Sequence, residues 1–408
     1  MDISILFVSP RTRIPQRRPY GFYELIEGVS KIVRRTGLVE PPPITNRPLP
    51  HSVTSYTVPV LNIMKHVNWP LPHVAKLVGT IKRLELEYDI VHFFSQNYPF
   101  SLCSIMLKKP KIITIESFPG IDYDHGDFIV NTVSSIYSWT FTRIALSHVD
   151  GVISVSRSAI EVLKRLGLRP GHTARIPLGI DTSQIKPDEK LGQKVRAELG
   201  LREVVGIFLG RLSTVKGIVF LVKAMEELEK KPLNIDLLVV GDGPERRLFK
   251  RLTRNRHARV YILGFKPDPF RFLCASDFLV LPSLGEGCPN VVLEAFACGK
   301  PVIATSVGAI PDIVKHGLTG LIIKPKDVKG LVNAMYTMAT DINRARAMGK
   351  NAREYAEREL DWTVIIKRVL RFYEEILSDP VCCSRCAIFI NLRRRQMPMR
   401  VPLNPGRT

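Results

Sequence analysis

The chain has 408 residues, 45% of them hydrophobic and 24% charged, and its formal net charge is +21. This length is too great for one ordinary hydrophobic core and predicts two domains of roughly 150 to 200 residues each. No run approaches the roughly 18 to 20 apolar residues that a membrane-spanning helix needs. No secretory signal precedes the first apolar run, so we expect a cytoplasmic protein.

The surplus of positive charge indicates anionic partners, and its distribution argues against nucleic acid. The densest basic block is 381–408, where no Asp or Glu occurs, and we expect a disordered tail there. No helix-turn-helix, zinc-finger or RNA-recognition signature accompanies it. Peripheral association with the cytoplasmic face of an anionic membrane stays open. The seven scattered cysteines predict neither a disulfide scaffold nor a metal site.

Short apolar runs, which predict buried strands, alternate with helical patterns along the chain. In the first half the predicted strands lie at 3–9, 89–95, 111–116 and 151–156, with helices near 21–35, 71–87, 127–148 and 157–166. In the second half the predicted strands lie at 204–210, 235–240, 259–264, 277–283, 301–306 and 320–325, with helices near 217–230, 244–254, 290–298 and 327–340.

Strands that are apolar along their whole length are typical of parallel sheets covered by helices on both faces. Two such series predict an α/β protein with two doubly wound, Rossmann-like domains. We expect the domains at 1–182 and 200–340, helices at 341–380 that pack back toward the first domain, and the tail at 381–408.

Ligands of parallel α/β sheets bind beyond the carboxyl ends of the strands, where helix N-termini attract anions. In the second domain a predicted strand ends at Leu209, and Gly210, Arg211 and Lys216 follow it ahead of a helix. Two cations beside glycine-exposed amides suit a diphosphate. Either cation alone is more often a surface salt-bridge residue.

The stretch GEGCPNVVLEAFACGKPVIAT, residues 285–305, reads as loop, helix and strand. It places Glu286 in the loop and Glu294 just inside the helix. Glu294 suits a vicinal diol such as a ribose, although a carboxylate near a helix start also has a plain electrostatic role. A nucleotide sugar would engage both carboxylates and both cations.

Residues 203–340 resemble the donor-binding domain of the retaining glycosyltransferases of family 4, also called the glycosyl transferase group 1 domain. The matching stretches are GRLSTVKG, VVGDGPER, ILGFKPDPFRFLCASDFLVLPS, EGCPNVVLEAFACGKPVIAT and VGAIPDIVKHGLTGLIIKPKD. The resemblance implies a GT-B fold, with the two Rossmann-like domains facing a cleft. It implies transfer of a sugar from a UDP-, GDP- or ADP-linked donor to an acceptor, with retention of the anomeric configuration. No metal or other cofactor is implied, because basic side chains and a helix dipole neutralise the diphosphate.

By this likeness Arg211 and Lys216 hold the diphosphate, Glu294 binds the ribose and Glu286 contacts the transferred sugar. The backbone near Gly264 and Phe265 touches the base. The catalytic residues implied are Arg211, Lys216, Glu286 and Glu116. The donor-binding residues implied are Gly210, Arg211, Lys216, Gly264, Phe265, Glu286, Gly287, Cys288, Pro289, Asn290, Val291 and Glu294.

The first domain departs from the family pattern in two places. Only Gly21 stands where the family usually has paired glycines, and Glu116 ends a predicted strand where the family often has a histidine. We expect Gly21, His92 and Glu116 on the acceptor side.

Two other functions stay open at this point, and the sequence argues against a third. The missing glycine pair fits a non-catalytic nucleotide-sugar-binding relative, and a nucleotide-sugar epimerase shares the fold. A Rossmann oxidoreductase needs a third glycine where this chain has Arg246. Candidate acceptors are a lipid carrier, a phospholipid, a polysaccharide or a small solute. Four aromatic residues that we place in loops favour an acceptor at a membrane surface: Phe22, Tyr23, Trp69 and Phe118.

Overall fold

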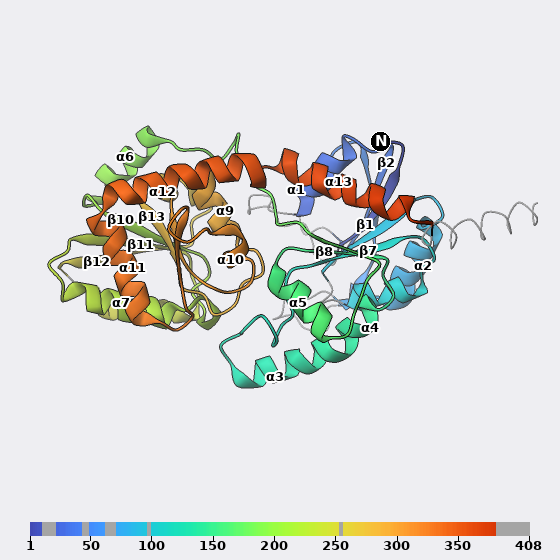
Figure 1. The fold of residues 1–408 in the computed structure, drawn as a ribbon, viewed down its shortest axis with the longest axis horizontal. Helices are drawn as coiled ribbons and strands as arrows, with labels where there is room; N and C mark the ends of the chain where they lie inside the picture. The colour runs from blue at the N-terminus through green and yellow to red at the C-terminus, as the bar shows by residue number, and fades with distance from the viewer. Residues whose placement is uncertain (10–21, 43–48, 62–70, 96–98, 253–255, 381–408) are drawn as a thin grey trace, which may run out of the picture.

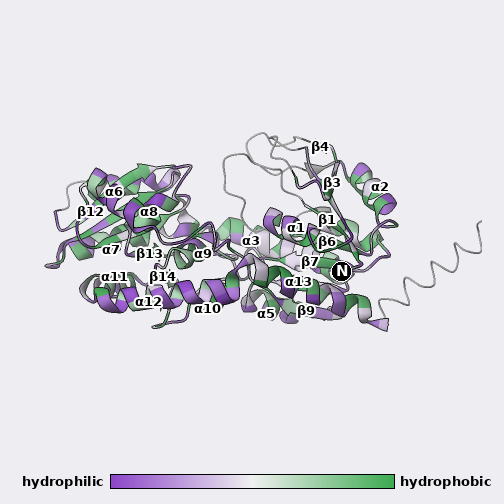
Figure 2. Ribbon diagram, turned by 90° about the horizontal axis from the view of Figure 1, so that it is seen from above, coloured by the Kyte–Doolittle hydropathy of each residue, from purple (hydrophilic) through white to green (hydrophobic). Residues whose placement is uncertain are grey.

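The computed structural model describes residues 1–9, 22–42, 49–61, 71–95, 99–252 and 256–380. Gly21, Trp69 and the tail at 381–408 lie outside these residues. Two parallel sheets, each flanked by helices, form two lobes (Figure 1). Their strands are largely hydrophobic (Figure 2). The predicted α/β architecture with two doubly wound sheets is confirmed.

The first lobe contains a seven-stranded sheet in the order β3-β2-β1-β6-β7-β8-β9. Its strands are β1 (Ser4–Val8), β2 (Arg35–Glu40), β3 (Val53–Thr57), β6 (Ile90–Phe94), β7 (Lys111–Ile115), β8 (Gly151–Ser154) and β9 (His172–Arg175). A small antiparallel pair is formed by β4 (Val60–Leu61) and β5 (Leu71–Pro72). The helical segments are α1 (Phe22–Ser30), α2 (Val74–Leu84), η1 (Pro99–Met106), α3 (Phe128–Tyr137), η2 (Ser138–Thr142), α4 (Arg143–Leu146) and α5 (Arg157–Arg165). The helix predicted over 21–35 is wrong at its end, because α1 stops at Ser30 and β2 begins at Arg35.

The second lobe contains a six-stranded sheet in the order β12-β11-β10-β13-β14-β15. Its strands are β10 (Val205–Leu209), β11 (Ile235–Val240), β12 (Ala258–Gly264), β13 (Phe278–Leu281), β14 (Val302–Thr305) and β15 (Gly320–Ile323). Its helical segments are α6 (Glu189–Leu199), η3 (Thr214–Lys216), α7 (Ile218–Glu229), η4 (Pro244–Leu252), α8 (Phe270–Ala275), α9 (Asn290–Ala297), α10 (Ile310–Ile313), α11 (Val328–Thr340) and α12 (Ile342–Tyr355). All six strands coincide with runs predicted from the sequence.

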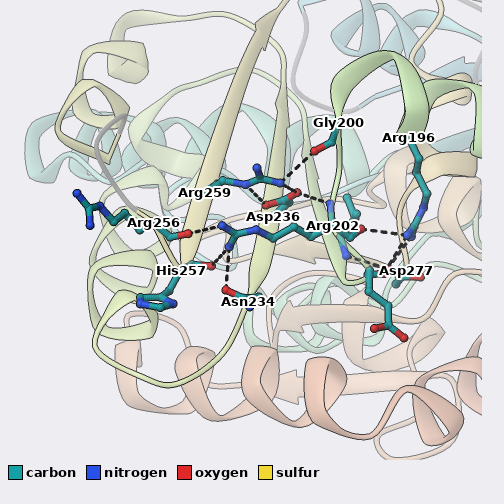
Figure 3. A network of polar contacts seen from close by, with 11 residues as sticks. Arg196, Gly200, Arg202, Asn234, Asp236, Arg256, His257, Arg259 and Asp277 are labelled. Carbon is teal, nitrogen blue, oxygen red and sulfur yellow. Dashed lines mark hydrogen bonds and ion pairs between the residues drawn. The ribbon is translucent and has the colours of Figure 1, made fainter.

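A polar network ties together the amino ends of these strands (Figure 3). Asp236, which is fully buried at the start of β11, accepts hydrogen bonds from the Arg202 backbone N–H at 2.7 Å and from the Arg259 guanidinium at 2.6 and 2.8 Å. Asp277, just before β13, pairs with Arg196 at 2.8 Å. Because these groups satisfy one another at the amino ends of the strands, the network stabilises the sheet and leaves the carboxyl ends for ligands.

The chain crosses between the lobes twice, and the two crossings are bonded to each other. The first crossing follows β9, and the second runs through η5 (Ala356–Leu360) into α13 (Trp362–Ser378), which extends from the second lobe over the first (Figure 1). The Ile180 N–H donates to the Leu360 carbonyl at 2.9 Å, and Thr182 Oγ1 donates to Asp361 at 2.5 Å. α13 then buries its apolar face against the core formed by α1 and the first sheet.

Candidate functional site

The carboxyl ends of β10 and β11 meet at two glycines. A Cβ on Gly241, whose φ is 146°, would lie 1.8 Å from the Gly210 carbonyl oxygen. Only glycine permits backbones to approach this closely in that conformation. The two glycines therefore let the carboxyl ends of these strands close on each other, with the Gly210 N–H donating to the Val240 carbonyl and the Gly241 N–H to the Gly264 carbonyl. A ligand at this edge would meet the side chains that follow β10.

The two cations after β10 lie in different environments. The Arg211 side chain is exposed, and it forms no hydrogen bond or ion pair with any residue that the structure describes. Lys216 ends η3, and its Nζ lies 2.6 Å from Oε1 of Glu286. The same carboxylate oxygen accepts a hydrogen bond from Ser283 Oγ at 2.6 Å. The fold thus brings together a lysine and a glutamate that are 70 positions apart in sequence.

The two glutamates of the stretch at 285–305 are both buried. Glu286 is 5% exposed and Glu294, the fifth residue of α9, is 4% exposed. The N-cap of α9, Pro289, supplies no side-chain hydrogen bond to the first turn, where the Val292 N–H donates to the Pro289 carbonyl at 3.0 Å. The first two N–H groups of the helix, those of Asn290 and Val291, point toward the side where an anionic or polar ligand is favoured. The buried Oδ1 of Asn290 in this turn accepts no hydrogen bond among the described residues.

Loops of the two lobes touch beside Glu286. A Cβ on Gly287 would lie 3.2 Å from Cβ of Glu116, the residue after β7. A Cβ on Gly285 would lie 2.7 Å from the Asp124 carbonyl oxygen. Glycine at these positions lets the first-lobe loop at 116–126 approach the second-lobe loop closely.

Burial and neighbouring carboxylates together raise pKa values at this contact. Burial, together with the negative charges of Glu286 and Glu116, raises the pKa of Tyr123 to about 12. Burial, followed by the charges of Glu116, Glu286 and Asp312, also raises the pKa of the Cys288 thiol to about 12. Glu116, Cys288 and Asn290 line one cleft to which both lobes contribute. This cleft can hold a ligand between the Glu116 carboxylate of the first lobe and the polar groups at the start of α9 in the second lobe.

Two family models match the chain: Glycosyltransferase Family 4 over residues 34–184 and Glycosyl transferases group 1 over residues 203–341. Over 310 residues the chain is 31% identical to the GDP-mannose-dependent alpha-(1-6)-phosphatidylinositol monomannoside mannosyltransferase of Mycolicibacterium smegmatis, covering 72% of this chain and 78% of the relative. The chain belongs to the family 4 glycosyltransferases.

One further sequence relative and two solved structures are also similar to this glycosyltransferase. It is 26% identical over 327 residues to the N-acetyl-alpha-D-glucosaminyl L-malate synthase of Bacillus anthracis, covering 79% of this chain and 84% of the relative. The sucrose-phosphate synthase of Thermosynechococcus elongatus superposes with a TM-score of 0.73 at 22% identity, covering 92% of this chain and 99% of the other. The Anabaena protein Alr3699/HepE in complex with UDP superposes with a TM-score of 0.71 at 21% identity, covering 92% and 100%. These two structures share the GT-B fold with the glycosyltransferase.

The remaining predicted donor residues lie around the same strand ends. Gly264 ends β12 and its carbonyl accepts from the Gly241 N–H at 2.9 Å, while the Phe265 side chain is 56% exposed. Pro289 is buried ahead of α9, and Val291 packs partly into the core.

The three residues predicted on the acceptor side do not lie together in the structure. Glu116 lines the cleft, whereas Gly21 lies outside the described residues. His92 is fully buried within β6, where its ring nitrogens lie 2.6 Å from Tyr373 Oη and 2.7 Å from Thr114 Oγ1. The placement of His92 at the acceptor side is wrong, because its ring is enclosed in the core and ties α13 to the sheet.

Sequence reasoning missed two parts of the site. Ser283, which donates a hydrogen bond to Glu286, ends the stretch DFLVLPS, whose apolar pattern predicts only a strand. The turn residues of SFPGIDYDHG indicate that Tyr123 and Asp124 lie in a loop, but they do not indicate that this loop reaches the second lobe. Within the described residues, no helix is long and apolar enough to cross a membrane, and no three His, Cys, Asp or Glu side chains are grouped to hold a metal ion.

Proposed function

We propose that this glycosyltransferase transfers a sugar from a nucleotide diphosphate sugar to an acceptor with retention of the anomeric configuration. The observation that carries the proposal is the contact between Lys216 and Glu286 beside the exposed Arg211. It supplies two cations for a diphosphate and a carboxylate for the sugar at the carboxyl ends of adjacent strands.

In this proposal Arg211 and Lys216 neutralise the diphosphate as it leaves, without a metal or other cofactor. Glu294 accepts hydrogen bonds from the ribose hydroxyls, and the backbone at Gly264 and Phe265 meets the base. The first turn of α9 and the loop before it complete the donor site through residues 287–291.

Glu286 accepts hydrogen bonds from the transferred sugar, and Glu116 faces it from the first lobe. Because Glu116 lies against Gly287, it can orient a sugar or an acceptor hydroxyl group at the cleft. The complex of Alr3699/HepE with UDP supports a uridine donor, and the GDP-mannose named for the mycobacterial relative supports a guanosine donor. The net charge of +21 supports peripheral association with an anionic membrane.

The test is thermal stability with UDP, GDP, ADP or NAD, for the natural protein and for Glu294→Ala. A nucleotide at 100 times its Kd should stabilise the folded state by roughly 2.7 kcal/mol. We expect one nucleoside diphosphate to raise the melting temperature and Glu294→Ala to abolish the rise. A response to NAD alone would refute the proposed donor class.

Retention is tested separately on the slow hydrolysis of the donor. NMR of the freshly released sugar should show the anomer that the donor carried. The opposite anomer would contradict retention. Nucleotide binding without any hydrolysis or transfer would favour the non-catalytic alternative.

A further inference from the structure

The segment α3-η2-α4 exposes an unusual number of large apolar side chains. None of the ten residues of α3 is buried, and Phe128 and Ile129 are 84% and 71% exposed. The segment lies along the edge of the first lobe opposite α13 (Figure 1). Its exposed large apolar residues are Phe128, Ile129, Val130, Val133, Ile136, Trp139, Phe141 and Ile144. We call these eight residues the apolar face.

Charged residues lie at both ends of the apolar face: Asp127 caps α3 at one end, and basic residues lie at the other. Residues 128–142 contain no Asp, Glu, Lys or Arg. Arg143 follows directly, and η1, which packs against α4, adds the exposed Ile105 and Met106 with Lys108 two residues on. A helical segment that exposes this many large apolar side chains indicates an interaction site.

We propose that the apolar face is the surface with which this glycosyltransferase inserts into the interface of an anionic lipid bilayer. Aromatic and aliphatic side chains with a cationic flank are the composition of helices that lie in a membrane interface. Anionic lipid also complements the net charge of +21. A second copy of the chain fits less well, since two copies would each bring that charge to the contact.

The apolar face is continuous with the loop that reaches the cleft. A Cβ on Gly120 would lie 2.1 Å from the Asn131 carbonyl oxygen, so the loop at 116–126 is packed against α3. The same loop contains Glu116 and touches Gly285. A bilayer on the apolar face therefore lies beside the acceptor side of the cleft. Resting on the proposed function, this favours an acceptor that is anchored in lipid.

The experiment is flotation of the full chain with phosphatidylcholine vesicles, with and without phosphatidylglycerol. The test variant carries Phe128→Ser, Ile136→Ser and Trp139→Ser, all at exposed positions. The control carries Ile32→Ser and Leu318→Ser, which are 45% and 54% exposed outside the apolar face. We expect the natural protein and the control to float with the mixed vesicles and the test variant to bind at least about tenfold more weakly.

Three outcomes would overturn the inference. The natural protein would fail to float, the test variant would float as well as the control, or sedimentation would show a dimer that the test variant abolishes, which would assign the face to a second copy. The nucleotide-induced rise in melting temperature, measured on the same variants without vesicles, separates this result from the proposed function. We expect all three proteins to retain that rise.

Discussion

Replacing Lys216 by alanine tests whether the ammonium group acts on the diphosphate of the donor. Lys216 Nζ lies 2.6 Å from Glu286 Oε1, and the lysine side chain remains 22% exposed. A hydrogen bond to a charged group contributes about 1.5–3 kcal/mol. At 1.4 kcal/mol per tenfold, its loss should weaken binding of the nucleoside diphosphate by about 10- to 150-fold. We expect the upper part of this range, because Glu286 without its cation also repels the diphosphate.

The assay is isothermal titration with the nucleoside diphosphate that stabilises the protein and with the corresponding nucleoside. Lys216→Ala should weaken binding of the diphosphate and leave the Kd of the nucleoside within about twofold, since the nucleoside has no phosphate to contact. Calorimetry is preferred to melting temperature because removing Lys216 also leaves the buried Glu286 carboxylate without an ammonium partner, which lowers stability by itself. The matched control is Lys223→Ala, an exposed lysine on α7.

An equal loss of affinity for the nucleoside and its diphosphate would refute this reasoning. It would mean that Lys216 holds the loop of Glu286 in place and does not contact the phosphates. A double-mutant cycle with Glu286→Gln separates the two roles. If the two residues act on one ligand, the cycle gives an interaction energy of about 0.5–3 kcal/mol for diphosphate binding.

Three further predictions concern stability, each measured by urea unfolding. Asp236→Ala should lower the unfolding free energy by about 1.5–3 kcal/mol, because the Arg202 N–H and the partly exposed Arg259 lose their carboxylate partner; an effect under about 0.5 kcal/mol would contradict this. Burial lowers the pKa of His92 to about 3, so the unfolded chain binds the extra proton and stability falls as pH drops below about 6.5. His92→Gln should therefore lose about 2 kcal/mol less than the natural protein between pH 7 and pH 5. Burial raises the pKa of Asp122 to about 6. The contribution of its protonated carboxyl group to the unfolding free energy is therefore full below about pH 3.8 and is lost as pH rises through 6. The natural protein should lose about 1 kcal/mol of stability from this group between pH 5 and pH 7, and Asp122→Asn should not.

The sequence predicted the second lobe more completely than the first for a physical reason. Its four inner strands are short apolar runs buried along their length, and its edge strands β12 and β15 are apolar although partly exposed, so the apolar pattern identifies all six. β3, in contrast, is an edge strand with the sequence VTSYT and mostly exposed side chains, so it lacks that pattern. β2 follows α1 closely enough that one helical pattern was extended through its start.

The sequence indicates which residues belong to the candidate site, but it does not indicate which of them are in contact. Lys216, Glu286 and Glu294 belong to motifs that occur in order along the second lobe, but the pairing of Lys216 with Glu286 depends on how β10 and β13 lie side by side. The packing of the loop at 116–126 on Gly285 requires both lobes, so local sequence could not indicate it.

Exposure was the property that sequence reasoning judged least well. Phe22 and Phe118, assigned to loops at a membrane surface, are buried, and Tyr23 is partly buried. The residues that are exposed lie instead in the helix predicted over 127–148, whose apolar character alone would suit a core. Whether an apolar helix is buried depends on what packs over it, and among the described residues nothing covers the outer face of α3.

The position of the Lys216–Glu286 pair suggests how donor binding and lobe movement are linked. A diphosphate that draws Lys216 away from Glu286 also frees that carboxylate for the sugar, so both ends of the donor act on one ion pair. The loop of Glu286 touches the first lobe through Gly285 and Gly287. A displacement of this loop therefore also displaces the first-lobe residues that it contacts. The lobes can respond only by turning about their two crossings, which are bonded together at Ile180 and Leu360. We therefore expect donor binding to change the angle between the lobes with this bonded pair of crossings as the hinge.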